Sequence, residues 1–172
     1  MKNYTLFLWI ALLMLGISGT IGAREVASFN DGWEFKKGPF SKEALQAVQK
    51  WNSDWQEGSI PHTWNADDMQ KQASAFYEGV GYYRKKFTFP ENMEGKRIFL
   101  RFEGVGSYAE VYINGYLAGT HKGAYSAFAC EISSQVKFGK ENEIIVKADN
   151  SSRPDVIPTN HILFGVYGGI YR

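Results

Sequence analysis

The chain has 172 residues, with 19 Lys and Arg against 18 Asp and Glu, so its formal net charge is +1. This length allows one domain with a full hydrophobic core, and the balanced charge argues against nucleic acid or an anionic membrane surface as the main partner. Aromatic residues make up 16% of the chain, which indicates a thick β core, a surface that stacks on ligands, or both.

The first 23 residues have the pattern of an export signal. Lys2 supplies a positive start, residues 6–15 form a nearly unbroken apolar run, and small residues follow up to Ala23. The stretch is long enough to span a membrane, but its small, polar end favours cleavage. We therefore expect a signal peptide over residues 1–23, a periplasmic or secreted mature chain, and no stable membrane insertion after cleavage.

The next part of the chain predicts few regular elements. Residues 30–32 (Asn-Asp-Gly) are a turn sequence, and residues 33–35 begin a short strand. Residues 41–50 have the apolar spacing and the N-terminal serine of one short helix. Residues 51–79 show no regular pattern, and an irregular stretch of this length in a compact domain is often functional.

From residue 81 onward apolar and polar residues alternate, which is the pattern of half-buried antiparallel strands. The predicted strands are residues 81–89, 98–102, 109–113, 116–118, 127–132 and 144–148. Pro90 ends the first of them. Asn114-Gly115 is a strong hairpin signal because both turn positions need positive φ. Short strands separated by turns predict an all-β fold, an antiparallel β-sandwich.

The histidines and the cysteine do not form a catalytic or metal-binding pattern. His62, His121 and His161 are far apart in the sequence, so no metal site is predicted. Cys130 is the only cysteine, which excludes an internal disulfide, and we expect it to be a buried, inert thiol. No phosphate-binding glycine loop and no G-x-S-x-G motif occurs, so no cofactor is predicted.

Paired carboxylates are the pattern that glycoside hydrolysis requires. Asp67 and Asp68 lie in the irregular stretch, where a ligand contact stays open. Glu141 and Glu143 fit a solvated turn that leads into a strand. Residues 150–152 (Asn-Ser-Ser) match a glycosylation sequon, but the match is weak and an ordinary turn is the favoured interpretation. The sequence therefore assigns no catalytic pair.

Short segments along the chain resemble the N-terminal sugar-binding domain of glycoside hydrolase family 2, the β-galactosidase and β-glucuronidase group. They are FNDGWEF at residues 29–35, IPHTWN at 60–65, GYYRKKF at 81–87, LRFEGV at 100–105, AEVYING at 109–115, GKENEIIV at 139–146 and GGIYR at 168–172. Each segment alone is common, but their order and spacing together match the family from residue 29 to the end of the chain.

The resemblance implies a jelly-roll sandwich, which in intact members precedes an immunoglobulin-like domain and a TIM barrel with two catalytic glutamates. Residues 24–172 are then the non-catalytic sugar-binding domain of a secreted retaining β-glycosidase. Its partners are a terminal β-linked sugar and the downstream domains of the same chain. The apolar segment 164–171, at the end of the given sequence, is typical of a strand whose apolar side chains must be buried against another part of the protein. We therefore expect a longer protein.

Sugar contacts in such a sandwich arise in the loops at one end. The predicted substrate-binding residues are Asn65, Asp155, Asn160 and His161. Family members often place an Asp six residues before the last Gly of the GGIYR-type motif, where this chain has Leu163. The resemblance therefore leaves open which sugar is bound.

Two other functions fit the same fold class. Jelly rolls also serve lectins, so a free-standing carbohydrate-binding module is one alternative, with Tyr108, Tyr112 and Tyr116 as its stacking platform. The other alternative is a structural adaptor domain that contacts no sugar.

Overall fold

The computed structural model describes residues 24–38, 55–68, 76–156 and 166–172. The predicted signal peptide (residues 1–23) and the predicted helix (residues 41–50) lie outside these ranges. In the described part the helical content is a 3₁₀ turn at Glu91–Met93, and no helix there is long and apolar enough to cross a membrane.

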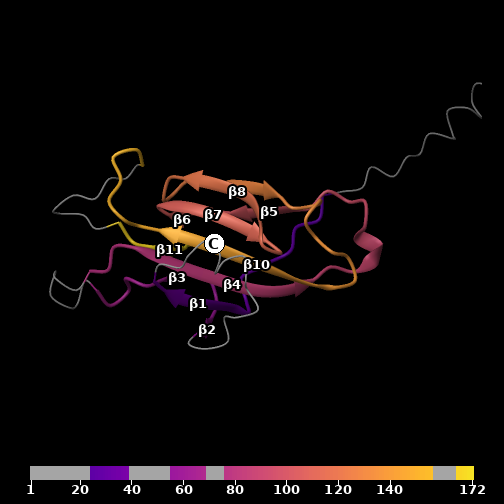
Figure 1. The fold of residues 1–172 in the computed structure, drawn as a ribbon, viewed down its shortest axis with the longest axis horizontal. Helices are drawn as coiled ribbons and strands as arrows, with labels where there is room; N and C mark the ends of the chain where they lie inside the picture. The colour runs from indigo at the N-terminus through magenta and orange to yellow at the C-terminus, as the bar shows by residue number, and fades with distance from the viewer. Residues whose placement is uncertain (1–23, 39–54, 69–75, 157–165) are drawn as a thin grey trace, which may run out of the picture.

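A six-stranded antiparallel sheet forms one layer of the molecule, in the order β2-β1-β4-β10-β7-β8 (Figure 1). In that order the strands are Gln56–Gly58, Trp33–Lys37, Val80–Thr88, Glu141–Asp149, Tyr108–Ile113 and Tyr116–Lys122. The central strands β4 and β10 pair along their whole length, from Glu141 opposite Thr88 to Asp149 opposite Val80.

Shorter strands form the second layer. One sheet has the order β3-β11-β6, and β5 pairs with β9 beside it. These strands are His62–Thr63, Gly169–Ile170, Val105–Gly106, Phe99–Phe102 and Phe128–Glu131. All these pairings are antiparallel, so the predicted all-β, jelly-roll sandwich is confirmed.

The alternation of apolar residues along the strands explains the core between the layers. Ile144, Val146 and Ala148 of β10 are fully buried in one cluster. The same cluster contains Leu100 of β5 and Ile170 of β11, so both layers contribute to it. Each buried Ile, Leu or Val side chain of this cluster stabilises the fold by about 1.5–3 kcal/mol relative to exposure.

The predicted hairpin between β7 and β8 is also present. Asn114 has φ 51° and Gly115 has φ 84°, and the strands pair on both sides of this turn. Positive φ at both positions matches the right-handed twist of the two strands, which is why an Asn-Gly pair is placed there.

The structure contains strands that the sequence did not predict, because pairing with another strand, and not a local apolar pattern, decides them. The irregular stretch 51–79 contains β2 and β3, which are too short to show a periodicity. Glu141 and Glu143, expected in a solvated turn, belong to β10 because they pair with β4. The surface ion pair of Glu141 with Lys86, at 2.9 Å, follows from that register.

Cys130 lies on the core side of β9. Its side chain is 6% exposed, and burial raises the pKa of its thiol. The predicted buried thiol is confirmed.

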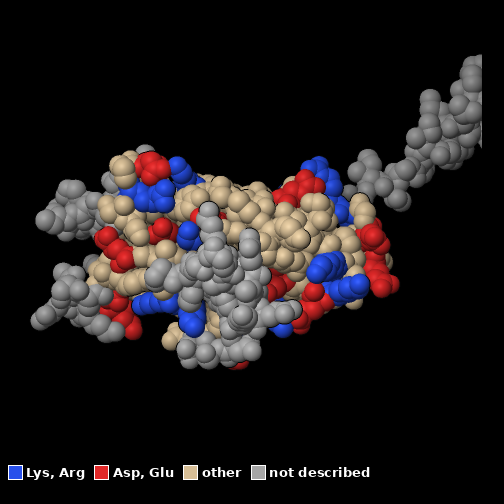
Figure 2. All heavy atoms as spheres, viewed as in Figure 1, with Lys and Arg blue, Asp and Glu red and all other residues tan. Residues whose placement is uncertain are grey.

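Charged residues of both signs lie toward both ends of the face shown in Figure 2. The surface over β7 and β8 between them is mostly uncharged in this view. This face shows no large patch of one sign in the described part, which agrees with the overall charge of +1.

Candidate functional site

One end of the sandwich gathers loops from distant parts of the chain. β10 ends there at Asp149, opposite the first residue of β4, Val80. Segments 64–68, 76–79, 150–156 and 166–168 meet around this point, on the left in Figure 1. We call this region the loop end. The turn between β7 and β8 lies at the opposite end of β10, which we call the hairpin end.

Asn65 lies at the centre of the loop end and is fully buried. Its Nδ2 donates to Asp68 Oδ2 at 2.7 Å and to the carbonyl of Tyr77 at 2.9 Å. Its Oδ1 accepts hydrogen bonds from the backbone N–H of Gly168 at 2.8 Å and from Asn150 Nδ2 at 3.3 Å. The predicted direct sugar contact of Asn65 does not fit this geometry, because the side chain has internal partners and no exposed surface.

Asn150 follows β10 directly and is also fully buried. Its Oδ1 accepts from Gly79 N–H at 2.8 Å, and its Nδ2 donates to the carbonyls of Val166 at 2.8 Å and Tyr77 at 3.2 Å. A glycan acceptor must be exposed, so the folded domain does not present the sequon at residues 150–152.

Asp68 completes this group. Its carboxylate is largely buried and accepts hydrogen bonds from Asn65 Nδ2 and, at 3.1 Å, from the backbone N–H of Tyr77. Its neighbour Asp67 is exposed. We call Asn65, Asp68 and Asn150, with the backbone groups they bind, the amide clamp. Buried polar groups that all find partners fix a unique arrangement of the segments that carry them.

Trp64 packs beneath the clamp. Its ring is buried and stacks on Phe35, with ring centroids 5.6 Å apart and an interplanar angle of 12°. A Cβ on Gly168 would lie 1.8 Å from the Trp64 ring, and one on Gly81 would lie 2.5 Å from it. The close approach of the indole to two backbone segments therefore requires glycine at both positions.

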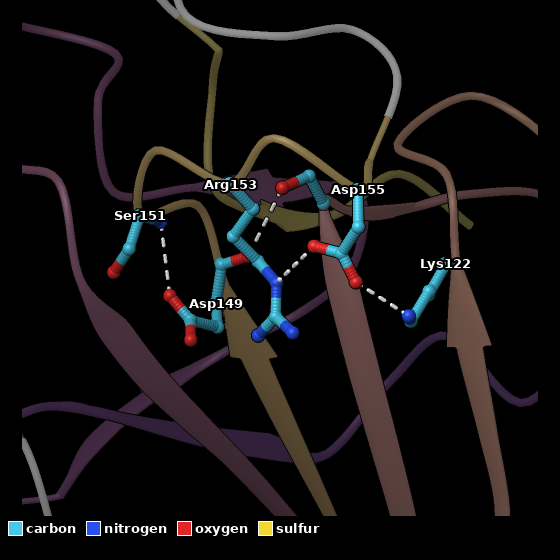
Figure 3. A network of polar contacts seen from close by, with 6 residues as sticks. Lys122, Asp149, Ser151, Arg153 and Asp155 are labelled. Carbon is cyan, nitrogen blue, oxygen red and sulfur yellow. Dashed lines mark hydrogen bonds and ion pairs between the residues drawn. The ribbon is translucent and has the colours of Figure 1, made fainter.

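Asp155 is a half-exposed side chain in a separate polar network (Figure 3). Its carboxylate accepts from Lys122 Nζ of β8 at 2.5 Å and from Arg153 Nε at 3.3 Å. These two hydrogen bonds lower the pKa of Asp155 to about 2. The Arg153 guanidinium lies over the Tyr108 ring at 4.7 Å, so the network attaches the loop after β10 to β7 and β8.

The sugar-contact prediction for Asp155 stays a prediction, and its exposed carboxylate at the loop end is compatible with it. Asn160, His161 and Leu163 lie outside the described residues, so their predictions stay untested. The structure thus places Asn65 and Asp155 at the same end of the sandwich but gives them different surroundings.

The histidines of the described part pack against aromatic rings. His62 Nδ1 lies 2.7 Å from Tyr83 Oη, and burial, with a smaller effect of Lys37, lowers the pKa of His62. His121 stacks on Phe128 with centroids 4.3 Å apart. Over the described ranges, no three His, Cys, Asp or Glu side chains come together as metal ligands would.

The three tyrosines proposed as a stacking platform do not share one surface. Tyr112 is opposite Leu117, whereas Tyr116 is opposite Ile113. Directly opposite residues point to the same face, so Tyr112 and Tyr116 point to opposite faces of the sheet. Tyr108 is half-buried under Arg153. The proposed platform is wrong in this register.

The family model of the glycosyl hydrolases family 2 sugar-binding domain matches residues 26–172. The chain therefore belongs to glycoside hydrolase family 2, as a sugar-binding domain of that family.

Relatives with activities in their names support this membership. The β-glucuronidase of Bacteroides fragilis is 35% identical over 171 residues, which is 99% of this chain and 23% of that protein. The β-galactosidase of Thermoanaerobacter pseudethanolicus is 34% identical over 154 residues, covering 87% of this chain and 20% of its own length. The chain thus spans less than a quarter of each of these relatives.

Solved structures show the same fold. A Bacteroides fragilis protein proposed to be a β-galactosidase superposes with a TM-score of 0.78 at 67% identity, over 87% of this chain and 22% of that one. The β-glucuronidase of Bacteroides uniformis superposes with a TM-score of 0.78 at 35% identity, over 87% of this chain and 17% of that one.

The sequence did not reveal the amide clamp as a unit. Asn65 was found through the IPHTWN segment and Asn150 through the sequon, but neither pattern indicates that the two side chains meet. Their contact joins residues 85 positions apart, and the contact of Asn65 with Gly168 joins residues 103 positions apart. No local spacing encodes such a contact.

Proposed function

We propose that this chain forms one wall of the substrate cleft in a family 2 β-glycosidase and helps to hold the catalytic part of the same protein. The observation that carries the proposal is the loop end, where a buried clamp joins four segments of a domain that belongs to a sugar-binding family. Loops fixed on a rigid sandwich are a common place for ligand contacts.

The whole protein would hydrolyse a terminal β-linked sugar with retention of configuration. That reaction uses two carboxyl groups about 5 Å apart, one as nucleophile and one as acid and base. We assign both carboxyl groups to the part of the protein outside this chain. The family relatives are named as β-glucuronidases and β-galactosidases, and these are the two sugars to test first.

The proposal is tested with two proteins. The longest natural chain that carries these residues and residues 24–172 alone are each assayed with an aryl β-glucuronide and an aryl β-galactoside. We expect turnover of one substrate by the long chain and none by residues 24–172. Turnover by residues 24–172, or no turnover of either glycoside by the long chain, would contradict the proposal.

We also propose that the protein is exported, on the basis of the apolar run and small residues before Arg24. The N-terminal sequence of the purified mature protein tests this. A start near Arg24 in a periplasmic or extracellular fraction is expected, and an intact Met1 in a cytoplasmic fraction would contradict it.

A further inference from the structure

Asn150 ties the segment that follows β10 to the segment that begins at Val166. Its Nδ2 donates to the carbonyl of Val166, 16 positions later, at 2.8 Å. The sequence between them contains Asp155, Asn160 and His161, three of the residues predicted to face the sugar. Asp155 is described, and its ion pair with Lys122 gives residues 150–156 a second attachment.

Asn65 fixes the returning segment from the other side. Its Oδ1 accepts from Gly168 N–H at 2.8 Å, and the neighbouring Thr63 Oγ1 donates to the Gly168 carbonyl at 2.7 Å. Both backbone polar groups of Gly168 are therefore held by residues of the 63–65 segment. A hydrogen bond from Asn150 Nδ2 to Asn65 Oδ1, at 3.3 Å, joins the contacts of Asn150 to those of Asn65.

We propose that Asn65 and Asn150 are positioning residues for sugar binding, which contact no ligand themselves and hold segments 150–156 and 166–168 in the arrangement that binds the sugar. This inference rests on the proposed function. Small displacements of binding groups cost large factors in recognition, and the clamp is what sets the relative position of these segments. Loss of the clamp should therefore weaken sugar binding more than it slows the chemical step.

The chain offers a matched control at the hairpin end. Asn142 is a buried asparagine near the start of β10, as Asn150 is just past its end. Asn142 Oδ1 accepts from Lys137 N–H at 2.7 Å and from Asn114 Nδ2 at 2.9 Å, and its Nδ2 donates to the carbonyls of Lys137 and Lys140. The two amides are thus similar in burial and bonding but lie at opposite ends of one strand.

The experiment measures kcat and KM of the longest natural chain with its preferred aryl glycoside, together with its urea midpoint. Asn150→Ala is expected to raise KM about tenfold and to change kcat less than about twofold, because the reacting groups are elsewhere. Asn142→Ala is expected to lower the urea midpoint to a similar extent and to leave KM unchanged. A rise in KM in Asn150→Ala alone would show that Asn150 positions the sugar-binding segments, since both variants lose stability.

A lowered urea midpoint with unchanged KM in Asn150→Ala would overturn the inference, and so would an equal rise in KM in Asn142→Ala. If Asn150→Ala does not fold, Thr63→Val replaces it, since it removes the hydroxyl that donates to the Gly168 carbonyl and accepts from the Asn65 N–H. That variant is expected to raise KM about threefold, and an unchanged KM would be decisive against positioning. An inactive wild-type chain would instead reject the proposed function, so the two failures are distinguishable.

Discussion

Two buried asparagines lie at opposite ends of β10, and the sequence distance to their hydrogen-bond partners differs between the two ends. Asn142, at the hairpin end, binds groups 2, 5 and 28 positions away. Asn150, at the loop end, binds groups 16, 71, 73 and 85 positions away. The hairpin end is therefore closed mainly by neighbouring sequence, whereas the loop end is assembled from the whole length of the domain. This is why a binding surface at the loop end depends on so many separate segments.

The largest expected effect comes from adding a charge to each asparagine. Asn65→Asp would place a second carboxylate where Asn65 Nδ2 now donates to Asp68 at 2.7 Å. An unpaired buried charge costs about 4 kcal/mol of unfolding free energy, and the loss should shrink as acid protonates the pair. Asn142→Asp also buries a charge, but no carboxylate is among the hydrogen-bond partners of Asn142, so we expect a smaller loss than for Asn65→Asp. Urea unfolding at pH 7 and pH 5 measures both.

The double variant Asn65→Asp with Asp68→Asn is the control for this effect. It keeps one carboxylate and one amide at the two positions, so it should recover part of the stability at pH 7. No recovery would mean that the loss arises elsewhere than from the two facing carboxylates.

Glycine replacements give the next largest difference between the ends. Gly168→Ala would bring a Cβ within 1.8 Å of the Trp64 ring, and overpacking of this kind costs about 3 kcal/mol. Gly115→Ala, in the hairpin, meets nothing within 4 Å but retains a φ of +84°, which costs about 1 kcal/mol. Unfolding free energies from urea titration test the order, and equal losses would contradict the tight packing assigned to Gly168.

Lowering the pH should change the stability contributed by Asp155 at the loop end and by Glu143 at the hairpin end in opposite directions. The pKa of Asp155 is lowered from 3.8 to about 2 by Lys122 and Arg153, so its stabilising effect is present above pH 4 and disappears as the pH falls toward 2. At the hairpin end, burial raises the pKa of Glu143, so the stability linked to its protonated form is present below its ordinary pKa and disappears as the pH rises. Lys122→Met should raise the pKa of Asp155, which NMR titration of the carboxyl carbon measures.

The titration has an internal control in Glu143. Its pKa should not change in Lys122→Met, because Lys122 is not among the groups that shift it. An unchanged Asp155 pKa would show that the ion pair with Lys122 is not formed in solution.

The smallest expected effect concerns Tyr116 at the hairpin end. This side chain is 69% exposed, so Tyr116→Ala should change the unfolding free energy by less than about 0.5 kcal/mol. It should also leave KM unchanged, because Tyr116 is remote from the loop end in the strand register. A clear loss of glycan affinity in this variant would instead favour a stacking role for this tyrosine.

The strands that were predicted correctly are those whose own residues carry the pattern. The alternation at 144–148 and the Asn114-Gly115 turn gave β10 and the β7–β8 hairpin. The strands that were missed, such as β2 and β3, have three and two residues and exist because they pair with distant segments, β2 with β1 and β3 with β11. Hydrogen bonding to a distant partner decides such strands, and a local pattern does not contain it.

The candidate site was predictable to a smaller extent for the same reason. The sequence-based prediction put Asn65 and Asp155 in loops at one end of the sandwich, where the structure also has them, but it did not distinguish the buried amide from the half-exposed carboxylate. That difference depends on Gly168 and Tyr77, whose backbone groups form hydrogen bonds with the Asn65 side chain. Burial of a polar residue in a loop is a property of the assembled fold.

The span of the amide clamp also bears on how the protein folds during synthesis. Asn65 emerges from the ribosome 103 residues before Gly168, the residue whose N–H its Oδ1 accepts. At about 5–20 residues per second, the clamp stays incomplete for seconds after its first member is made, while the β7–β8 hairpin can already close. The loop end is therefore completed late in synthesis, because the Asn65 side chain lacks the Gly168 N–H until residue 168 is available.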